Sequence, residues 1–332
     1  MKVQRIECKE CGCIRQEKIH FVTGKRSYTN KFARYVVDLS RIGTIKDVAK
    51  FLNISWDTVK DIQKRYLQRH YGNPDLSKLE YVGIDEFAVR KGHVYKTIVV
   101  DLLTGQVVYV GDGKGADALD KFWKKVRKAK ARIKAVATDL SAAFISSVKE
   151  NAPEATQVFD HFHVVKLMND TLDKLRRQAY NQEADLMKRK VLKGTRWLLL
   201  CNGEDIYDSC HKNRLENALE MNAPLMKGYY LKESLREIWM QVTKEQAEQV
   251  LKDWVKQAQD SKVPLIQKFA ATLLAHRSGI LSWYDHHIST GKIEGINNKI
   301  KTMKRQAYGY RDEKFFELKI LSLHDKSYAF GG

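Results

Sequence analysis

Apolar residues follow two different periods along the chain, and the period changes near residue 79. From there, the runs YVGIDEFAV, HVYKTIVVDLL and TGQVVYVGDG predict three successive strands, the last two joined by a short turn at residues 103–105. A helix with inward-facing aromatic and aliphatic side chains is expected over residues 116–130. The runs IKAVATD and ATQVFD then predict two more strands, separated by a short helix over residues 141–149.

The order of these elements indicates the type of sheet. Three strands connected as a meander and followed by alternating helix and strand are typical of a ribonuclease H-like sheet, which is mixed in direction and covered by helices. Residues 161–289 contain no convincing strand run and are rich in Leu, Lys, Glu, Ala and Gln at helical spacing. We therefore predict an α/β fold, a ribonuclease H-like mixed sheet split by a large all-α insertion.

Before the sheet, residues 44–70 show the pattern of two short helices. The apolar positions of the first helix are Ile45, Val48, Ala49 and Leu52, and those of the second are Val59, Ile62 and Tyr66. Asn53 and Ile54 break the pattern between them, and Ser55 is placed to cap the second helix. This pattern predicts an N-terminal helix-turn-helix module whose second helix enters the major groove of DNA. A hairpin with a purely structural role is the alternative.

The residues expected to contact DNA lie on the exposed face of this module. They are Lys46, Ser55, Trp56, Thr58, Lys60 and Lys64. The composition favours a polyanionic partner, because 59 Lys and Arg residues against 40 Asp and Glu give a net charge of +19. Residues 1–79 hold 17 basic and 8 acidic residues, a net charge of +9. A generally basic, soluble surface is the alternative explanation of these totals.

Composition also sets expectations about the compartment. No early apolar stretch resembles the core of a signal peptide, and no window of about 18 apolar residues suggests a membrane span. We therefore expect a cytoplasmic, nucleoid-associated protein with no membrane partner. The five cysteines are an odd number without a secretory signal, so structural disulfides are not expected.

The first three cysteines form a candidate zinc-binding segment. Cys8, Cys11 and Cys13 make a Cys-x-x-Cys knuckle with a third thiol close by. A structural zinc ion normally requires four ligands, and the best remaining local candidate is His20. Reduced thiols that bind no metal are the alternative.

Three acidic residues stand out because of where they fall. Asp85 lies within the first predicted strand, Asp139 ends the fourth, and Glu294 opens a basic helical run. Buried strands rarely carry carboxylates unless something compensates the charge. In a ribonuclease H-like order the first and fourth strands are neighbours, so the two aspartates should lie close together. Their hard oxygens predict Mg²⁺ or Mn²⁺, and two such ions support the cleavage of phosphodiesters.

Each of these acids also has a structural explanation. Asp85 or Glu86 could pair with Lys91. Asp139 could cap the following helix, and Glu294 could stabilise the N-terminus of its own helix. A single site accounts for all three positions at once, whereas the structural explanations are independent of one another.

Several separated motifs resemble one known family. GIDEFA, TDLSAAF, FDHFHVVKLMND and GKIEGINNKIKTMKRQAYGY are similar to segments of bacterial insertion-sequence transposases of the DDE superfamily, in the ISL-type group. The resemblance runs from about residue 30 to the C-terminus. It implies that Asp85, Asp139 and Glu294 are the catalytic, metal-binding triad. It also implies an all-helical domain inserted before the glutamate and an activity that cuts and joins DNA at the ends of a mobile element.

Residues outside the triad take part in the resemblance. Asp160 and His163 are similar to an Asp-x-x-His element of related transposases and would support the site, by bonding each other or a DNA phosphate. A helix cap with a half-buried histidine is the alternative. Trp197 resembles a tryptophan of the helical insertion that could stack on a flipped base, although packing in a core is the more common role of such a residue.

The basic run after Glu294 is a candidate phosphate-binding face. It contains Asn298, Lys301, Lys304 and Arg305, which are three or four residues apart or adjacent. A solvated stripe of charge is the alternative. The cysteines depart from the family, whose members usually carry a zinc ribbon of two Cys pairs, so an intact zinc module is not implied.

These observations divide the chain into four parts. They are a partial zinc-ribbon-like segment (1–25), a helix-turn-helix domain (26–78), a catalytic core (79–162 and 285–332) and a helical insertion (163–284). We expect a transposase that binds terminal inverted repeats and target DNA as a homodimer or larger assembly, and that hydrolyses and then joins phosphodiesters. A noncatalytic DNA-binding regulator and a nuclease without joining activity are the alternatives.

Overall fold

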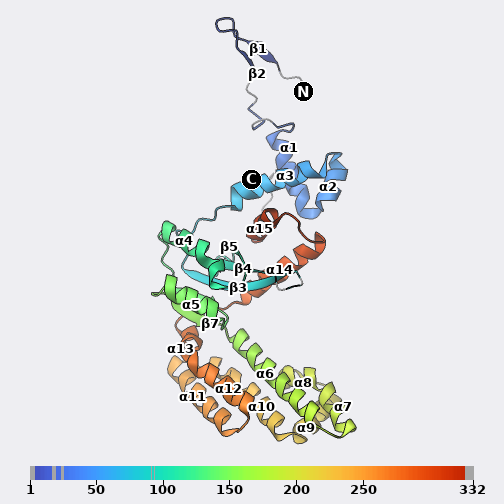
Figure 1. The fold of residues 1–332 in the computed structure, drawn as a ribbon, viewed down its shortest axis with the longest axis vertical. Coiled ribbons are helices and arrows are strands. Elements are labelled where there is room, and N and C mark those ends of the chain that lie inside the picture. The colour runs from blue at the N-terminus through green and yellow to red at the C-terminus, as the bar shows by residue number, and fades with distance from the viewer. Residues whose placement is uncertain (1–3, 17–19, 24–25, 91, 93, 326–332) are drawn as a thin grey trace. The chain divides into compact units, whose positions relative to one another are not determined.

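The computed structural model describes residues 4–16, 20–23, 26–90, 92 and 94–325. It divides into two compact units, one formed by residues 1–74 and 298–332 and the other by residues 75–297 (Figure 1). Lys91, considered above as a partner of Asp85 or Glu86, lies outside the described residues. Among the described residues, every helix is too short or too polar to span a membrane.

The first unit contains the predicted helix-turn-helix. Its helices are α1 (Asn30–Ile42), α2 (Ile45–Leu52) and α3 (Trp56–Tyr71). Asn53 ends α2 in the left-handed conformation, and the Ser55 hydroxyl accepts a hydrogen bond from the Thr58 amide at 3.2 Å. The apolar stripes meet in a small core around Val48 and Val59. The prediction of two helices with Ser55 as a cap is confirmed, and α1 is an additional helix.

Helix α15 (Glu313–Leu321) belongs to the same unit, although residues 298–332 were grouped with the core in the sequence analysis. Asp312 caps this helix by accepting a hydrogen bond from the Phe315 amide at 3.0 Å. The same carboxylate forms ion pairs with Lys60 at 3.1 Å and Lys64 at 2.8 Å, both on α3. These contacts fasten the C-terminal segment to the helix that was expected to read DNA.

A short hairpin near the N-terminus carries the three cysteines. Strands β1 (Arg5–Glu7) and β2 (Ile14–Gln16) pair antiparallel. Between them, hydrogen bonds from the backbone N–H groups of Cys11 and Glu10 lower the pKa of the Cys8 thiol. In the part of the chain that the structure describes, these thiols do not form a metal-binding group of three or more ligands. Zinc binding therefore stays a prediction.

The second unit is built on one five-stranded sheet. Its strands are β3 (Tyr81–Arg90), β4 (Val94–Asp101), β5 (Val107–Asp112), β6 (Ala135–Thr138) and β7 (Thr156–Phe159). Their spatial order is β5-β4-β3-β6-β7; the first three are antiparallel, and β6 and β7 run parallel to β3. This is the mixed, ribonuclease H-like sheet that the element order predicted.

Two helices pack on this sheet. The expected helix over residues 116–130 is a 3₁₀ turn η1 (Ala116–Leu119) followed by α4 (Asp120–Ala129), and the next helix is α5 (Ala142–Asn151). Trp123 is 1% exposed, and its indole N–H donates to the Ser147 hydroxyl at 2.8 Å, which joins α4 to α5. The buried indole therefore has its polar group satisfied.

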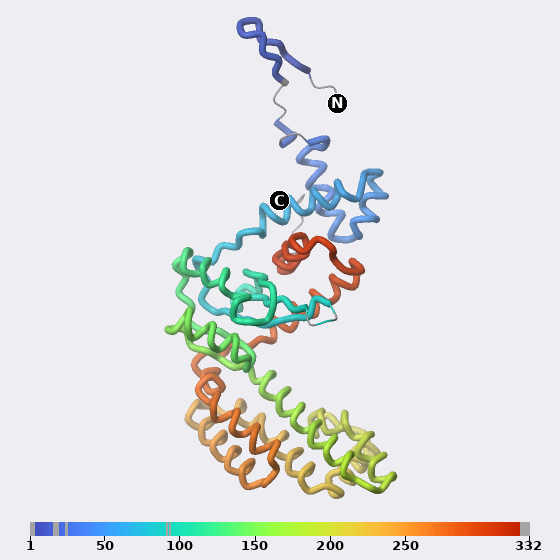
Figure 2. Tube along the Cα trace, in the orientation of Figure 1, coloured from blue at the N-terminus to red at the C-terminus, as the bar shows by residue number. Residues whose placement is uncertain are grey.

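The insertion is entirely helical, as predicted. Its elements are α6 (His161–Gln182), α7 (Leu186–Gly194), α8 (Arg196–Leu200), η2 (Gly203–Asp205), α9 (Ser209–Glu220), α10 (Ala223–Ser234), η3 (Leu235–Trp239), α11 (Lys244–Asp260), α12 (Pro264–Ala275), α13 (Arg277–Leu281) and η4 (Ser282–Tyr284). They enclose their own apolar core. The chain leaves the sheet through α6 (green) and returns through α13 (orange), which contacts β7 (Figure 2). Helix α14 (Gly291–Gln306) follows.

Candidate active site

The pairing of β3 with β6 places Asp85 beside Asp139. The two strands are parallel, with Tyr81 opposite Ala135 and Gly83 opposite Ala137. The same offset matches Asp85 to Asp139, which is the first residue after β6. The two aspartates therefore lie where the shared ladder ends, at neighbouring positions of the sheet.

Asp85 is a poorly compensated carboxylate. Burial raises its pKa to about 7, and the carboxylates of Glu86 and Asp139 act in the same direction. Two hydrogen bonds oppose this rise, one from the Glu86 amide at 2.8 Å and one from Nδ2 of Asn297 at 2.8 Å. Near neutral pH the charged form is thus held by hydrogen bonds without an adjacent cation from the described chain.

Glu86 extends the acidic cluster. Burial raises the pKa of its carboxyl group, and Asp139 raises it further, whereas Lys114 and Lys166 lower it. Asp139 itself accepts a hydrogen bond from the Ser141 amide at 2.9 Å, the cap-like contact considered as its structural explanation. That contact uses one carboxylate oxygen, and the second oxygen can still bind a cation.

Helix α14 is anchored to the sheet just before Glu294. A Cβ atom on Gly83 would come within 2.4 Å of the Ile293 Cδ1 atom, so Ile293 approaches β3 where that strand has no side chain. The Lys292 ammonium donates to the Leu102 carbonyl at 2.5 Å. Glu294 is exposed, in the first turn of the helix.

Asp160 provides a second anchor for α14. It is 1% exposed, and it accepts hydrogen bonds from the Phe162 amide at 3.0 Å and the Thr290 amide at 2.6 Å. The Thr290 hydroxyl donates to the same carboxylate. Burial alone would raise the pKa of Asp160, but the hydrogen bonds from His161, Thr290 and Phe162 outweigh it and hold the pKa well below its usual range. Asp160 therefore joins the start of α6 to the residue preceding α14.

His163 lies among the acids that the sequence predicted. Burial lowers the pKa of its imidazole, whereas Asp139, Asp160 and Glu294 each raise it and Lys166 lowers it. The three carboxylates are thus all within electrostatic range of one histidine. The ring that bonds Asp160 is that of His161, at 3.2 Å.

The donor set suits a hard divalent cation. Within the described residues, no three His, Cys, Asp or Glu side chains already form a closed metal-binding group. Asp85 and Asp139 nevertheless share one end of a ladder, and Oδ1 of the adjacent Asn297 is buried without a hydrogen-bond partner among the described residues. Carboxylate and carboxamide oxygens are preferred ligands of Mg²⁺ and Mn²⁺. The neighbouring oxygens of Asp85 and Asp139 are therefore of the kind that such an ion prefers.

Comparison with known proteins decides the family. Residues 82–320 match the model of the DDE transposase family ISL3, which is described as "Transposase". Residues 17–67 match the model described as "Helix-turn-helix domain of transposase family ISL3". The chain belongs to the ISL3 family of DDE transposases. It is therefore an insertion-sequence transposase, a polynucleotidyl transferase with a helix-turn-helix DNA-binding domain and a DDE catalytic domain. The resemblance to the ISL-type group is confirmed, and the regulator and nuclease alternatives lose their support.

Two insertion-sequence transposases agree with this membership. The chain is 36% identical over 320 residues to the transposase for insertion sequence element IS1001 of Bordetella parapertussis, covering 96% of this chain and 79% of that protein. It is 30% identical over 301 residues to the transposase for IS1557 of Mycobacterium tuberculosis, covering 83% and 67%. Among solved structures, the Drosophila P element transposase strand transfer complex aligns over 92% of this chain and 94% of that chain, with 12% identity and a TM-score of 0.47.

Sequence reasoning missed one residue that contacts a candidate catalytic acid. Asn297 contacts Asp85, whereas the sequence analysis selected the next residue, Asn298, which is exposed. A signal was present, because Asn297 is a polar residue within the apolar stripe formed by Ile293, Ile296 and Ile300. A polar residue at such a position indicates a specific partner.

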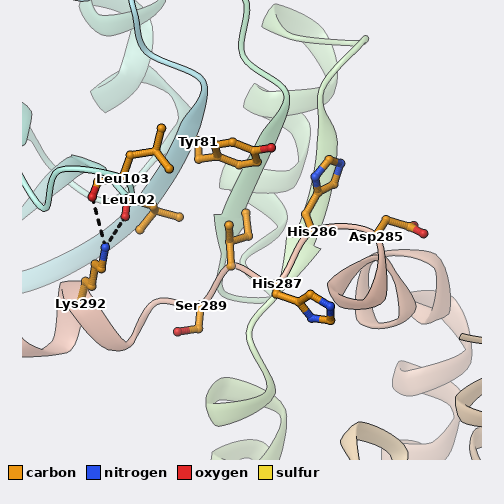
Figure 3. A pocket seen from close by; sticks show the side chains of 9 residues that line it. Tyr81, Leu102, Leu103, Asp285, His286, His287, Ser289 and Lys292 are labelled. Atoms are coloured by element: carbon orange, nitrogen blue, oxygen red, sulfur yellow. Dashed lines mark hydrogen bonds between the residues drawn. The ribbon is translucent and has the colours of Figure 1, made fainter. Parts of the chain in front are cut away.

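A cavity of about 450 Å³ lies beside the loop that leads into α14 (Figure 3). It is lined by residues including Tyr81, His286 and Lys292, and the rings of Tyr81 and His286 lie 5.8 Å apart. In Figure 3 the His287 ring points away from Tyr81. None of the three predicted catalytic acids lines this cavity. The cavity is therefore separate from the candidate active site.

The predicted DNA-contacting residues of the helix-turn-helix differ in solvent exposure and in the bonds that they already make within the protein. Trp56 is 57% exposed at the start of α3. Lys46 is also exposed, whereas Thr58 is half-buried and shares a hydrogen bond between its hydroxyl and that of Ser55, which caps the helix. Lys60 and Lys64 are ion-paired with Asp312, as described above. The DNA-contact role of each residue stays a prediction.

Trp197 is 71% exposed, so the expectation that packing in a core is its more common role is wrong here. The Arg196 guanidinium lies over its ring at 4.8 Å. Asp173 pairs with Arg196 at 3.5 Å, Arg176 at 2.8 Å and Arg177 at 3.1 Å. One carboxylate thus holds three guanidinium groups beside an exposed indole.

The basic face of α14 is largely accessible. Asn298, Lys301 and Arg305 are exposed, and Lys304 is half-buried. Burial lowers the pKa of the Lys304 ammonium. These residues belong to the first unit, on the helix whose first turn carries Glu294.

Proposed function

We propose that Asp85, Asp139 and Glu294 hold the divalent cations with which this transposase cuts and joins DNA. The parallel register of β3 and β6, which sets Asp85 beside Asp139, is the observation that carries the proposal. The hydrogen bond from Asn297 to Asp85 supports the assignment of Glu294, because Asn297 follows Glu294 by about one helical turn. DDE transposases generally use divalent metal ions, which agrees with this donor set.

Contacts within the chain fix the positions of the three acids. The sheet holds Asp85 and Asp139 as rigid neighbours, and Gly83 lets Ile293 bring α14 against β3. Asp160 fixes the residue just before α14 and thereby limits where Glu294 can lie. A pair of Mg²⁺ or Mn²⁺ ions would supply activation of the attacking oxygen and stabilisation of the departing one.

The same acids would serve two successive displacements. In the first, the oxygen of water attacks a phosphodiester at the element end, and the departing oxygen becomes a free 3′ hydroxyl group. In the second, that hydroxyl attacks a phosphodiester of the target, one phosphorus–oxygen bond forms, and another breaks. Both displacements need carboxylates that hold cations in a fixed position rather than a covalent intermediate on the protein.

Three exposed regions of the chain are suited to binding DNA. We propose that the helix-turn-helix reads terminal inverted repeats through α3, with Lys46, Trp56 and Thr58 among its contacts. The exposed basic residues of α14 would hold phosphates, and Trp197 with its arginine cluster would contact unstacked DNA. Because transposition joins two element ends to one target, we expect two or more copies of the chain on DNA.

Strand cleavage and joining test this proposal directly. A DNA fragment carrying matched terminal repeats is incubated with Mg²⁺ and the wild type, Asp139→Ala or Asp120→Ala, and the products are resolved on a denaturing gel. Asp120 is an exposed acid in the first turn of α4 and makes a matched control. We expect cleavage and joining by the wild type and control and neither by Asp139→Ala. Full activity of Asp139→Ala would refute the triad, and cleavage without joining would indicate a nuclease.

A further inference from the structure

Asn297 occupies an unusual position on α14. It is 8% exposed and belongs to the stripe of Ile293, Ile296 and Ile300, where an apolar side chain would be expected. Its Nδ2 donates to Oδ2 of Asp85 across 2.8 Å, a bond between residues 212 positions apart in sequence. Its Oδ1 is buried and has no hydrogen-bond partner among the described residues.

A buried carbonyl oxygen without a partner destabilises the fold. Such a group loses its hydrogen bonds to water on folding, and leucine at the same position would avoid that cost. Most buried polar groups in folded proteins have a hydrogen-bond partner, so one without a protein partner calls for an explanation such as an ordered water or an ion. The neighbouring side chain is Asp85, which has only hydrogen bonds to compensate its charge.

A carboxamide suits this place better than a charged side chain. Lysine or arginine would neutralise Asp85 and compete with a divalent cation, and an aspartate would add to the repulsion among Asp85, Glu86 and Asp139. The neutral amide N–H orients Asp85 without taking up its charge, and the amide oxygen is a hard acceptor. Hydrogen bonds of this kind to metal-ligating carboxylates set their orientation and their affinity for the metal.

We propose that Asn297 is a positioning residue of the active site: its Nδ2 orients Asp85, and its Oδ1 accepts a hydrogen bond from the water shell of the bound cation. This inference rests on the proposed function, in which Asp85 and Glu294 hold that cation. Magnesium and manganese keep several of their waters when protein carboxylates bind them. One of these waters could donate a hydrogen bond to Oδ1 of Asn297.

Manganese binding provides a readout that does not depend on activity. Free Mn²⁺ is measured by electron paramagnetic resonance during titration of the full chain as wild type, Asn297→Ala, Asp85→Ala and Asn169→Ala. Asn169 is a matched control, because its Oδ1 is also buried without a partner in the described part of the chain, but it lies on α6 and does not contact Asp85. We expect Asn297→Ala to weaken binding about 10- to 100-fold and Asn169→Ala to leave it within about twofold.

The outcomes separate this inference from the proposed function. Wild-type binding by Asn297→Ala together with lost binding by Asp85→Ala would overturn the role of Asn297 and leave the triad intact. Unchanged binding by Asp85→Ala, or no binding by the wild type, would overturn the proposed site and this inference with it. If Asn297→Ala does not fold, Asn297→Leu matches the apolar stripe and is expected to give the same loss.

Discussion

Replacing Asp85 by Asn should stabilise the metal-free protein while it removes a proposed metal ligand. The carboxyl pKa of Asp85 rises from 3.8 to about 7 on folding, with burial as the main cause. Because the folded-state value lies above the unfolded one, the group carries no penalty below pH 3.8 and costs stability as the pH rises to about 7. Asparagine at this position has nearly the same shape and no charge to bury.

The size of the effect follows from this rise. A pKa change from 3.8 to about 7 corresponds to roughly 4 kcal/mol at pH 8, an upper limit because the group keeps some contact with water. At pH 5 the corresponding cost is about 1.5 kcal/mol. Asparagine has one acceptor oxygen, so one of the bonds from the Glu86 amide and Asn297 is lost at about 1 kcal/mol. We expect a net gain of about 2–3 kcal/mol at pH 8 and close to zero at pH 5.

Calorimetry in the presence of a chelator measures this difference. A gain of about 2–3 kcal/mol corresponds to a rise in the melting temperature of the sheet-containing unit of roughly 4–10 °C at pH 8. Asp120→Asn, in an exposed acid of α4, should show no comparable dependence on pH. A loss of stability in Asp85→Asn at pH 8, or an effect equal at both pH values, would refute the argument that a buried charge destabilises the site.

Three further variants test other parts of the structure. Asp160→Ala leaves the Thr290 amide and hydroxyl without their acceptor and should cost about 3 kcal/mol in urea unfolding; a cost below about 1 kcal/mol would contradict the anchoring role. Gly83→Ala places a methyl group 2.4 Å from a terminal Ile293 carbon and should lower stability by about 1–3 kcal/mol, with partial recovery when Ile293→Val is added; no loss would argue against the close approach of α14. Asp312→Asn frees two lysines of α3, so DNA affinity measured by fluorescence anisotropy should increase and its logarithmic salt slope should steepen by about one; an unchanged slope would indicate that α3 does not contact phosphates.

The sheet could be predicted because its signals are local. Alternation and continuous apolar runs identify strands, and a meander followed by helix-linked strands restricts the strand order. The aspartates could be placed together for the same reason, since adjacent parallel strands set Asp85 and Asp139 at equal offset. The helix over residues 116–130 was predicted as one piece, whereas the structure begins it with a 3₁₀ turn at Ala116–Leu119.

The position of α14 could not be predicted from local pattern. Its anchors are long-range contacts: Ile293 against Gly83, Thr290 with Asp160, and Asn297 with Asp85. No periodicity links residues so far apart, and the resemblance to a family was needed to select Glu294. The spacing of the basic residues selected Asn298, because charged positions indicate the exposed face of a helix. The contact to Asp85 is made by Asn297, which lies on the buried face.

The contact between the C-terminal segment and α3 could not be predicted for a related reason. Asp312 was an ordinary helix cap in the sequence, but its carboxylate also pairs with Lys60 and Lys64, which lie about 250 positions earlier. The apolar face of α15 gave no indication of which helix it would pack against. Single-sequence patterns identify amphipathic helices but not their partners.

The hydrogen bonds between Asp160 and Thr290 bring the two ends of the helical insertion together. The two residues are 130 positions apart, yet the Asp160 carboxylate accepts a hydrogen bond directly from the Thr290 backbone amide. The helical domain thus leaves and re-enters the core close to one junction, where α13 and η4 also contact β7. We expect a helical segment of different length to be exchangeable there, provided that Thr290 still donates to Asp160 ahead of α14. The same junction is a natural place to attach a foreign domain or a short artificial loop.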